Sequence, residues 1–167
     1  SFNSLESFVK VDLDYIIISN PTSLHYESLQ FLDAQYKKIK FLIEKPLFHN
    51  TQPFDSQSNF YFVGYNLRFH QVVDEFIKLI KNKSLISIAI KTYSYLPQWR
   101  KNVNYQSSSS ALKSQGGGVL RDLSHEIDLV NFLFGTPNFL YADSRKISNL
   151  EIETDDYLLA CGQLDCG

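Results

Sequence analysis

The most informative group of chemically competent residues follows a triple glycine, Gly116 to Gly118. Asp122 and His125 lie three residues apart in a segment with helical spacing, so they would share one face of a helix. A carboxylate there can orient the imidazole and stabilise its protonated form. Such a pair suits a base that removes a hydroxyl proton while hydride leaves the same carbon. A helix with a polar, solvated face explains the same residues about equally well.

Two further polar groups directly follow apolar, strand-like runs. Asn20 and Pro21 end the first run, with His25 close behind, and Glu44 and Lys45 end the second. Open α/β sheets bind ligands at the carboxyl ends of their strands, so both groups stand where cofactor contacts are expected. Lys45 could donate a hydrogen bond to a substrate hydroxyl or shuttle a proton. The ordinary alternatives are a strand-to-helix turn with a packed or solvated His25, and a surface Glu-Lys pair.

The elements that would position these groups fall into two halves. Residues 14–20, 40–43 and 59–65 read as strands of a parallel sheet, the first buried on both faces, and residues 22–36 as a helix. This order indicates part of a doubly wound α/β sheet. A composition shift near residue 70 predicts a boundary, which gives one domain over residues 1–70 and another over residues 71–167.

The second half has a different pattern. Residues 84–95 alternate with Ile86, Ile88 and Ile90 on one face and predict an antiparallel strand. A long polar loop follows. The other predicted elements are helices at 72–80 and 119–134, the latter ended by Gly135, and strands near 139–144 and 156–162.

The composition excludes several classes of function. Hydrophobic residues make up 44% and charged residues 20% of the 167 residues, and the net charge is −2. Such a chain folds, and it gives no electrostatic reason to expect nucleic acid or an anionic membrane as a partner. No apolar run approaches the roughly 20 residues that span a bilayer. Cys161 and Cys166 match no metal or redox spacing, so no metal site is expected and the cytoplasm is the default compartment.

Taken in order, the motifs resemble the Gfo/Idh/MocA family, named for glucose-fructose oxidoreductase and inositol dehydrogenase. The resembling segments are 14–25, 44–47, 63–70, 95–100 and 116–128. The resemblance implies α/β plus α+β architecture. It implies the C-terminal part of a Rossmann-type parallel sheet, followed by a truncated substrate domain with an antiparallel or mixed sheet.

The resemblance also implies residue roles. Lys45 would contact substrate and nicotinamide, and His125 would be the acid/base with Asp122 as its partner, although the family often spaces these two four apart. The residues implied along the cofactor are Asn20, Pro21, His25, Glu44 and Arg68. The residues implied on the substrate side are Tyr95, Trp99 and Arg100. The cofactor would be NAD or NADP, and the substrate a sugar or nucleotide-sugar carbinol.

One family feature is missing from the sequence. No Gly-x-Gly-x-x-Gly occurs, the chain contains no methionine, and Ser1 to Asp14 resembles the region before the family's fourth strand. The chain is therefore expected to be a fragment that binds NAD poorly or not at all on its own. A homo-oligomer is expected for the parent protein. Two alternatives remain open, a catalytically inactive folding or assembly module and a sugar-binding module without redox chemistry.

Overall fold

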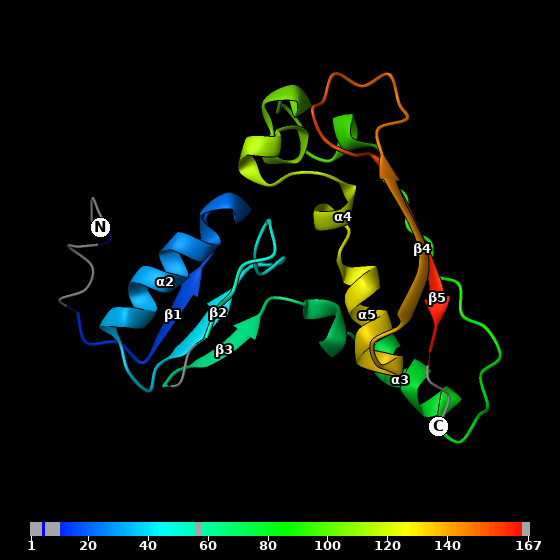
Figure 1. Ribbon diagram of the computed structural model, residues 1–167, viewed down its shortest axis with the longest axis horizontal. Coiled ribbons are helices and arrows are strands. Elements are labelled where there is room, and N and C mark those ends of the chain that lie inside the picture. The colour runs from blue at the N-terminus through cyan, green and yellow to red at the C-terminus, as the bar shows by residue number, and fades with distance from the viewer. Residues whose placement is uncertain (1–4, 6–10, 56–57, 165–167) are drawn as a thin grey trace.

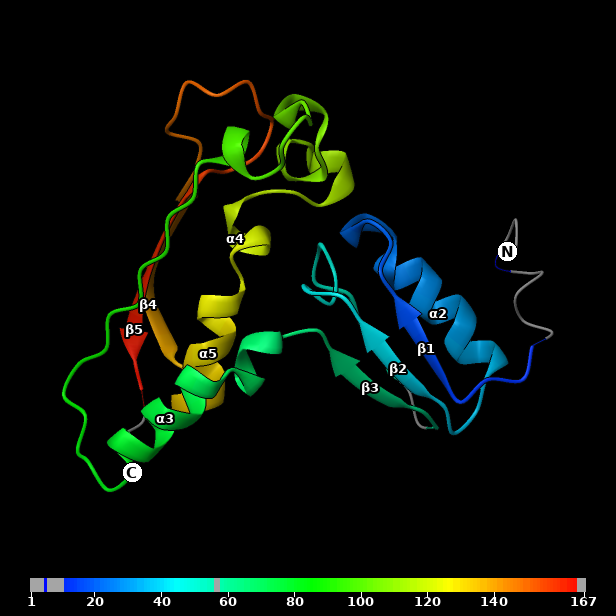
Figure 2. The same cartoon turned by 180° about the vertical axis from the view of Figure 1, so that it is seen from behind.

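The structure is a computed structural model that describes residues 5, 11–55 and 58–164, so Cys166 and Ser1 lie outside the described residues. Two sheets occupy opposite sides of the molecule, and the helices α4 and α5 lie between them (Figures 1 and 2). No helix in the described ranges is long and apolar enough to cross a bilayer. The same ranges contain no group of three or more histidine, cysteine or acidic side chains that could hold a metal.

The first sheet is parallel, as predicted. It has the order β1-β2-β3, with β1 at Tyr15–Ile18, β2 at Lys40–Ile43 and β3 at Phe60–Val63. Ile18 pairs with Ile43, and Ile43 pairs with Val63, so the three strands end at the same level. Polar residues that follow these strands are thereby brought to one edge of the sheet.

The core of this half lies between the sheet and α2 (His25–Gln35). Alternate strand residues face the helix, and the buried apolar side chains are Ile16, Ile18, Leu29, Leu32, Ile39, Phe41 and Ile43. Each such side chain contributes roughly 1.5–3 kcal/mol on burial. The prediction that the first strand is buried on both faces is wrong, because Tyr15 and Ile17 are 63% and 54% exposed. Within the described residues α2 covers only one face.

The described part of the second half contains three α-helices, short 3₁₀ turns between residues 96 and 115, and a two-stranded antiparallel sheet. The elements are α3 at Gln71–Ile80, α4 at Val119–Asp122, α5 at His125–Phe134, β4 at Asn138–Arg145 and β5 at Tyr157–Gln163. Both predicted strands and the helix end at Gly135 are confirmed, since Gly135 adopts a positive φ of 83° after α5. The 3₁₀ turn η2 (Asn66–Phe69) leads from the first half into the second.

Two predictions for this half are wrong. Residues 84–95 form no strand in the described structure, and Ile86 is fully exposed, because no neighbouring strand pairs with them. The single helix expected over 119–134 is two helices. Leu123 leaves the helical region at φ −107° and ψ 33°, which ends α4 before α5 begins at His125.

Candidate functional site

Lys45 joins the two halves of the molecule. It follows β2, its peptide bond to Pro46 is cis, and its Nζ donates hydrogen bonds to the carbonyl oxygens of Arg121 and Asp122 at the end of α4. Those two carbonyls belong to the last turn of a helix, where the backbone has no helical partner for them. The lysine ammonium therefore lies at the end of α4, three residues before α5 begins at His125.

A second set of contacts fixes α4 against the same loop. Arg121 Nε donates to the His49 carbonyl at 2.8 Å and its Nη1 to the Gly117 carbonyl at 3.1 Å. Gly116 adopts a positive φ of 78°, and a Cβ there would stand 2.9 Å from the Cβ of His49. The triple glycine thus permits the close backbone approach that the sequence indicated.

His125 occupies the first position of α5, beside the ring of Tyr65. The two ring centroids are 5.8 Å apart and nearly perpendicular. Burial lowers the pKa of His125, the positive charge of Lys45 lowers it further, and Glu126 and Asp128 oppose these effects. The imidazole is therefore largely neutral at neutral pH and able to accept a proton.

Asp122 is the last residue of α4, three positions before His125, but its side chain is not bonded to His125. Burial raises the pKa of its carboxyl, while a hydrogen bond from Ser110 and the charge of Lys45 partly offset that rise. Among the described residues no hydrogen bond joins this carboxyl to His125, whose Nδ1 is buried without a partner. The expected shared helix face is wrong, because the break at Leu123 separates the two side chains.

His25 is placed differently from its expected role at the cofactor. Its side chain is 1% exposed. Its Nδ1 lies 3.0 Å from the carbonyl oxygen of Pro46 and 3.2 Å from that of Leu47, and its Nε2 lies 3.0 Å from that of Asn20. A ring enclosed in this way has no free edge for a cofactor. It instead ties the end of β1 to the loop that carries Lys45, which corresponds to the packed alternative.

The other residues expected at the cofactor differ in their contacts and in their exposure. Asn20 donates from Nδ2 to Ser28 Oγ at 2.8 Å, and Pro21 opens the turn before α2. Glu44 is exposed at the end of β2. Arg68 is engaged by Asp128, a buried acid that sequence reasoning missed although it stands three positions after His125 on α5.

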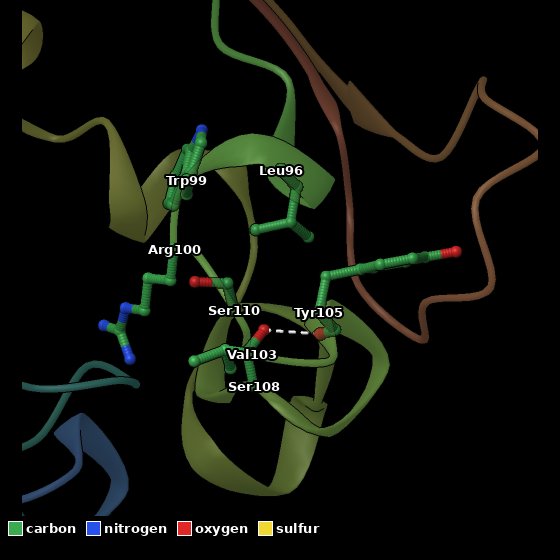
Figure 3. A pocket seen from close by; sticks show the side chains of 7 residues that line it. All are labelled: Leu96, Trp99, Arg100, Val103, Tyr105, Ser108 and Ser110. Carbon is green, nitrogen blue, oxygen red and sulfur yellow. Dashed lines mark hydrogen bonds between the residues drawn. The ribbon is translucent and has the colours of Figure 1, made fainter.

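The residues expected at the substrate lie on the loop after residue 95. Trp99 and Arg100 line a shallow hollow, and Tyr95 is not among its lining residues. Figure 3 shows the hydroxyl of Ser110 turned toward the side of the hollow where Arg100 lies. Ser110 also lowers the pKa of the Asp122 carboxyl, so this side of the hollow lies near the end of α4. Ser110 belongs to a serine run that sequence reasoning took for loop only.

A family model for the GFO/IDH/MocA C-terminal domain matches residues 85–167. The chain belongs to the Gfo/Idh/MocA family. A comparison with curated proteins found no significant match.

Several solved structures share the Gfo/Idh/MocA fold of this chain. The yvaA structure from Bacillus subtilis is 22% identical, with a TM-score of 0.69, over 98% of this chain and 47% of that one. An oxidoreductase from Thermotoga maritima is 13% identical, with a TM-score of 0.71, over 98% and 53%. The WlbA dehydrogenase from Bordetella pertussis, solved with NADH and UDP-GlcNAcA, is 15% identical, with a TM-score of 0.69, over 98% and 49%. The chain thus spans about half the length of these structures.

The nicotinamide side of a Gfo/Idh/MocA site has suitable residues in this chain. The aligned strand ends of the first sheet form the edge where such folds bind ligands. At the start of α5, Ser124 Oγ, His125 Nδ1 and Glu126 Oε2 are buried without hydrogen-bond partners. Buried polar atoms are almost always paired, so a polar ligand or water fits beside them. The sequence contains no Gly-x-Gly-x-x-Gly motif of the kind that binds the pyrophosphate in such folds.

Proposed function

We propose that the protein carrying this chain is an NAD(P)-dependent oxidoreductase that moves hydride between the carbinol carbon of a sugar or sugar derivative and nicotinamide. The observation that carries the proposal is the placement of Lys45 against the segment that leads into His125. These residues come from different halves of the sequence, yet the lysine ammonium bonds the end of α4 and its charge acts on the imidazole. A neutral base suits the deprotonation of a hydroxyl, and a nearby cation stabilises the negative charge that develops on the oxygen.

Each of the three residues has a distinct proposed role. His125 accepts the hydroxyl proton, because burial keeps its imidazole neutral. Lys45 donates a hydrogen bond to the same oxygen and stabilises the negative charge that grows on it. Asp122 holds a partly buried carboxyl within the field of Lys45, and Ser110 links it to the substrate loop. A bound nicotinamide would supply the hydride acceptor or donor.

The proposed cofactor contacts lie at the strand ends. Asn20, Pro21 and Glu44 border the edge where β1 and β2 end together. This edge serves the nicotinamide end only, so NAD and NADP are equally compatible with it. We expect the chain of residues 1–167 alone to bind NAD poorly. Calorimetric titration with NAD is the check, and binding with a Kd in the micromolar range would contradict this expectation.

The proposed substrate is a sugar with an anionic group, such as a nucleotide-sugar. Trp99 offers an aromatic face for a sugar ring, and Arg100 forms no ion pair within the described part of the chain. A guanidinium with free donors suits a carboxylate or a phosphate. The WlbA dehydrogenase solved with UDP-GlcNAcA has the same fold, which supports this class of substrate. Tyr95, exposed at the start of the loop, would contact the far side of the substrate.

The experiment uses the complete gene product and follows NADH or NADPH formation with a panel of sugars and nucleotide-sugars. The variants are Lys45→Ala and His125→Ala, with Lys78→Ala on the exposed face of α3 as the control. Each site variant is expected to lose about a hundredfold or more of turnover, since positioned acid–base groups typically contribute that much. Unchanged turnover in both site variants would reject the proposal.

A further inference from the structure

Arg68 and Asp128 form an ion pair between η2 and α5. Arg68 Nε donates to Asp128 Oδ2 at 2.8 Å, and its Nη2 donates to Oδ1, so both carboxylate oxygens are bound. Asp128 is 6% exposed, whereas the Arg68 side chain is 39% exposed. A two-point contact of this kind fixes direction as well as distance. The buried carboxylate would be unfavourable without it, because little solvent reaches it.

The same guanidinium lies near two aromatic rings. Its Cζ lies 5.1 Å from the ring centroid of Phe132 on α5 and 5.8 Å from that of Tyr65 before η2. The ring of Tyr65 in turn contacts the imidazole of His125, with an interplanar angle of 82°. Arg68 is therefore linked to His125 by two routes. One passes through Asp128 and the first turn of α5, and the other passes through Tyr65.

We propose that the Arg68–Asp128 pair is a positioning device that sets the direction and the charge environment of His125. This inference rests on the proposed role of His125 as the proton acceptor. Arg68 would thus position His125, whereas the family resemblance implies a contact with the cofactor for it. The pair spans the junction between the parallel sheet and the helix that carries the base, so it couples the cofactor half to the proton-transfer residue.

The charges around His125 give the pair a measurable signature. The charged groups that act on its imidazole are Lys45 and Glu44 from the loop after β2, and Glu126 and Asp128 from α5. Asp128 favours the imidazolium, and Arg68 neutralises that carboxylate. Removal of the guanidinium should therefore raise the pKa of His125, whereas removal of the carboxylate should lower it. A role in packing alone would instead move both variants toward the ordinary value of 6.5 as the site opens to water.

The test is an NMR titration of the His125 ring in the complete gene product. The variants are Arg68→Gln and Asp128→Asn. Arg68→Lys keeps the charge without the two-point contact, so it should move the pKa less than Arg68→Gln. Lys78→Gln, which breaks the exposed pair of 2.7 Å with Glu75, is the matched control and should leave the titration unchanged. The inference predicts opposite shifts in the first two variants, and shifts in the same direction, or none, would overturn it.

Kinetics separate this inference from a direct role at the cofactor. We expect kcat to fall roughly tenfold to a hundredfold in Arg68→Gln with little change in the KM for NAD, since small misplacements of a base are costly. A large rise in that KM with an unchanged His125 titration would place Arg68 at the cofactor and overturn the inference. If no sugar is oxidised at all, the proposed function fails, and the titration alone still decides the role of the pair. If Asp128→Asn does not fold, the two Arg68 variants decide the question. The pKa of His125 should then rise more in Arg68→Gln than in Arg68→Lys, and equal shifts would overturn the inference.

Discussion

Gly117 offers the sharpest structural test of how the substrate loop is fixed to α4. A Cβ at this position would stand 2.2 Å from the carbonyl oxygen of Ser109 and 2.5 Å from that of Ser110, whereas ordinary contacts begin near 3.4 Å. Both obstacles are backbone atoms, so no side chain can rotate away. The Gly117→Ala substitution must displace the serine segment or α4 by about 1 Å, and overpacking of this kind costs about 3 kcal/mol.

Gly135→Ala is the matched control, because it isolates the cost of backbone conformation. Gly135 has a φ of +83°, and an added Cβ would meet nothing within 4 Å. The expected loss there is about 1 kcal/mol, from the strain of a side chain in the left-handed region alone. Urea denaturation of the complete gene product measures both losses. The reasoning is refuted if Gly117→Ala is no more destabilising than Gly135→Ala.

The displacement has a consequence at the site as well. Ser110 would move away from Asp122, and loss of that hydrogen bond should raise the already elevated pKa of the Asp122 carboxyl. Infrared or NMR titration of that carboxyl follows the change. If Gly117→Ala lowers the free energy of unfolding by about 3 kcal/mol and the pKa of Asp122 does not change, Ser110 does not follow the backbone shift.

Three further predictions concern single groups. His25→Leu should lose about 2–3 kcal/mol in chemical denaturation, because the buried carbonyl oxygens around the ring lose its N–H donor, and His25→Gln should lose less. The acid limb of kcat/KM for oxidation should lie below pH 6.5, since burial lowers the pKa of His125 and the neutral ring is the active form; a limb above that value would contradict this. Burial raises the pKa of Asp156, but hydrogen bonds from Ser148 and Ile147 outweigh it and hold the pKa below 3.8. Its stabilisation is present above pH 3.8 and is lost as the pH falls through the lower folded-state pKa. Asp156→Asn should therefore weaken the fold at neutral pH and not in acid, as denaturation at both values would show.

The sequence predicted the elements that local pattern determines. The strand runs of the first sheet carry β-branched and aromatic residues, and the end of α5 has a glycine in the left-handed region, so both were predictable. Residues 84–95 have the alternation of a strand, but a strand also requires a partner, which alternation cannot reveal. The break at Leu123 was likewise hidden, because the apolar spacing continues across it.

The residues of the candidate site were chosen from motifs, and the sequence held no signal for their contacts. Lys45 and His125 were matched by motif order, and nothing in their spacing of 80 residues indicates that the lysine bonds the end of α4 or that its charge acts on the imidazole. The settings of His25 and Arg68 depend on tertiary partners, namely the carbonyls around Pro46 and the buried carboxylate of Asp128. No local signal announces such partners. Side chains that resemble cofactor contacts in sequence can therefore be structural links in space.

The most direct test of the central claim is the titration of His125 in the complete gene product before and after Lys45→Met. If the two residues share one site, the wild-type pKa lies below 6.5 and rises when the neighbouring positive charge is removed. A pKa of His125 that is the same in both proteins would place the lysine outside the field of the histidine and contradict the account.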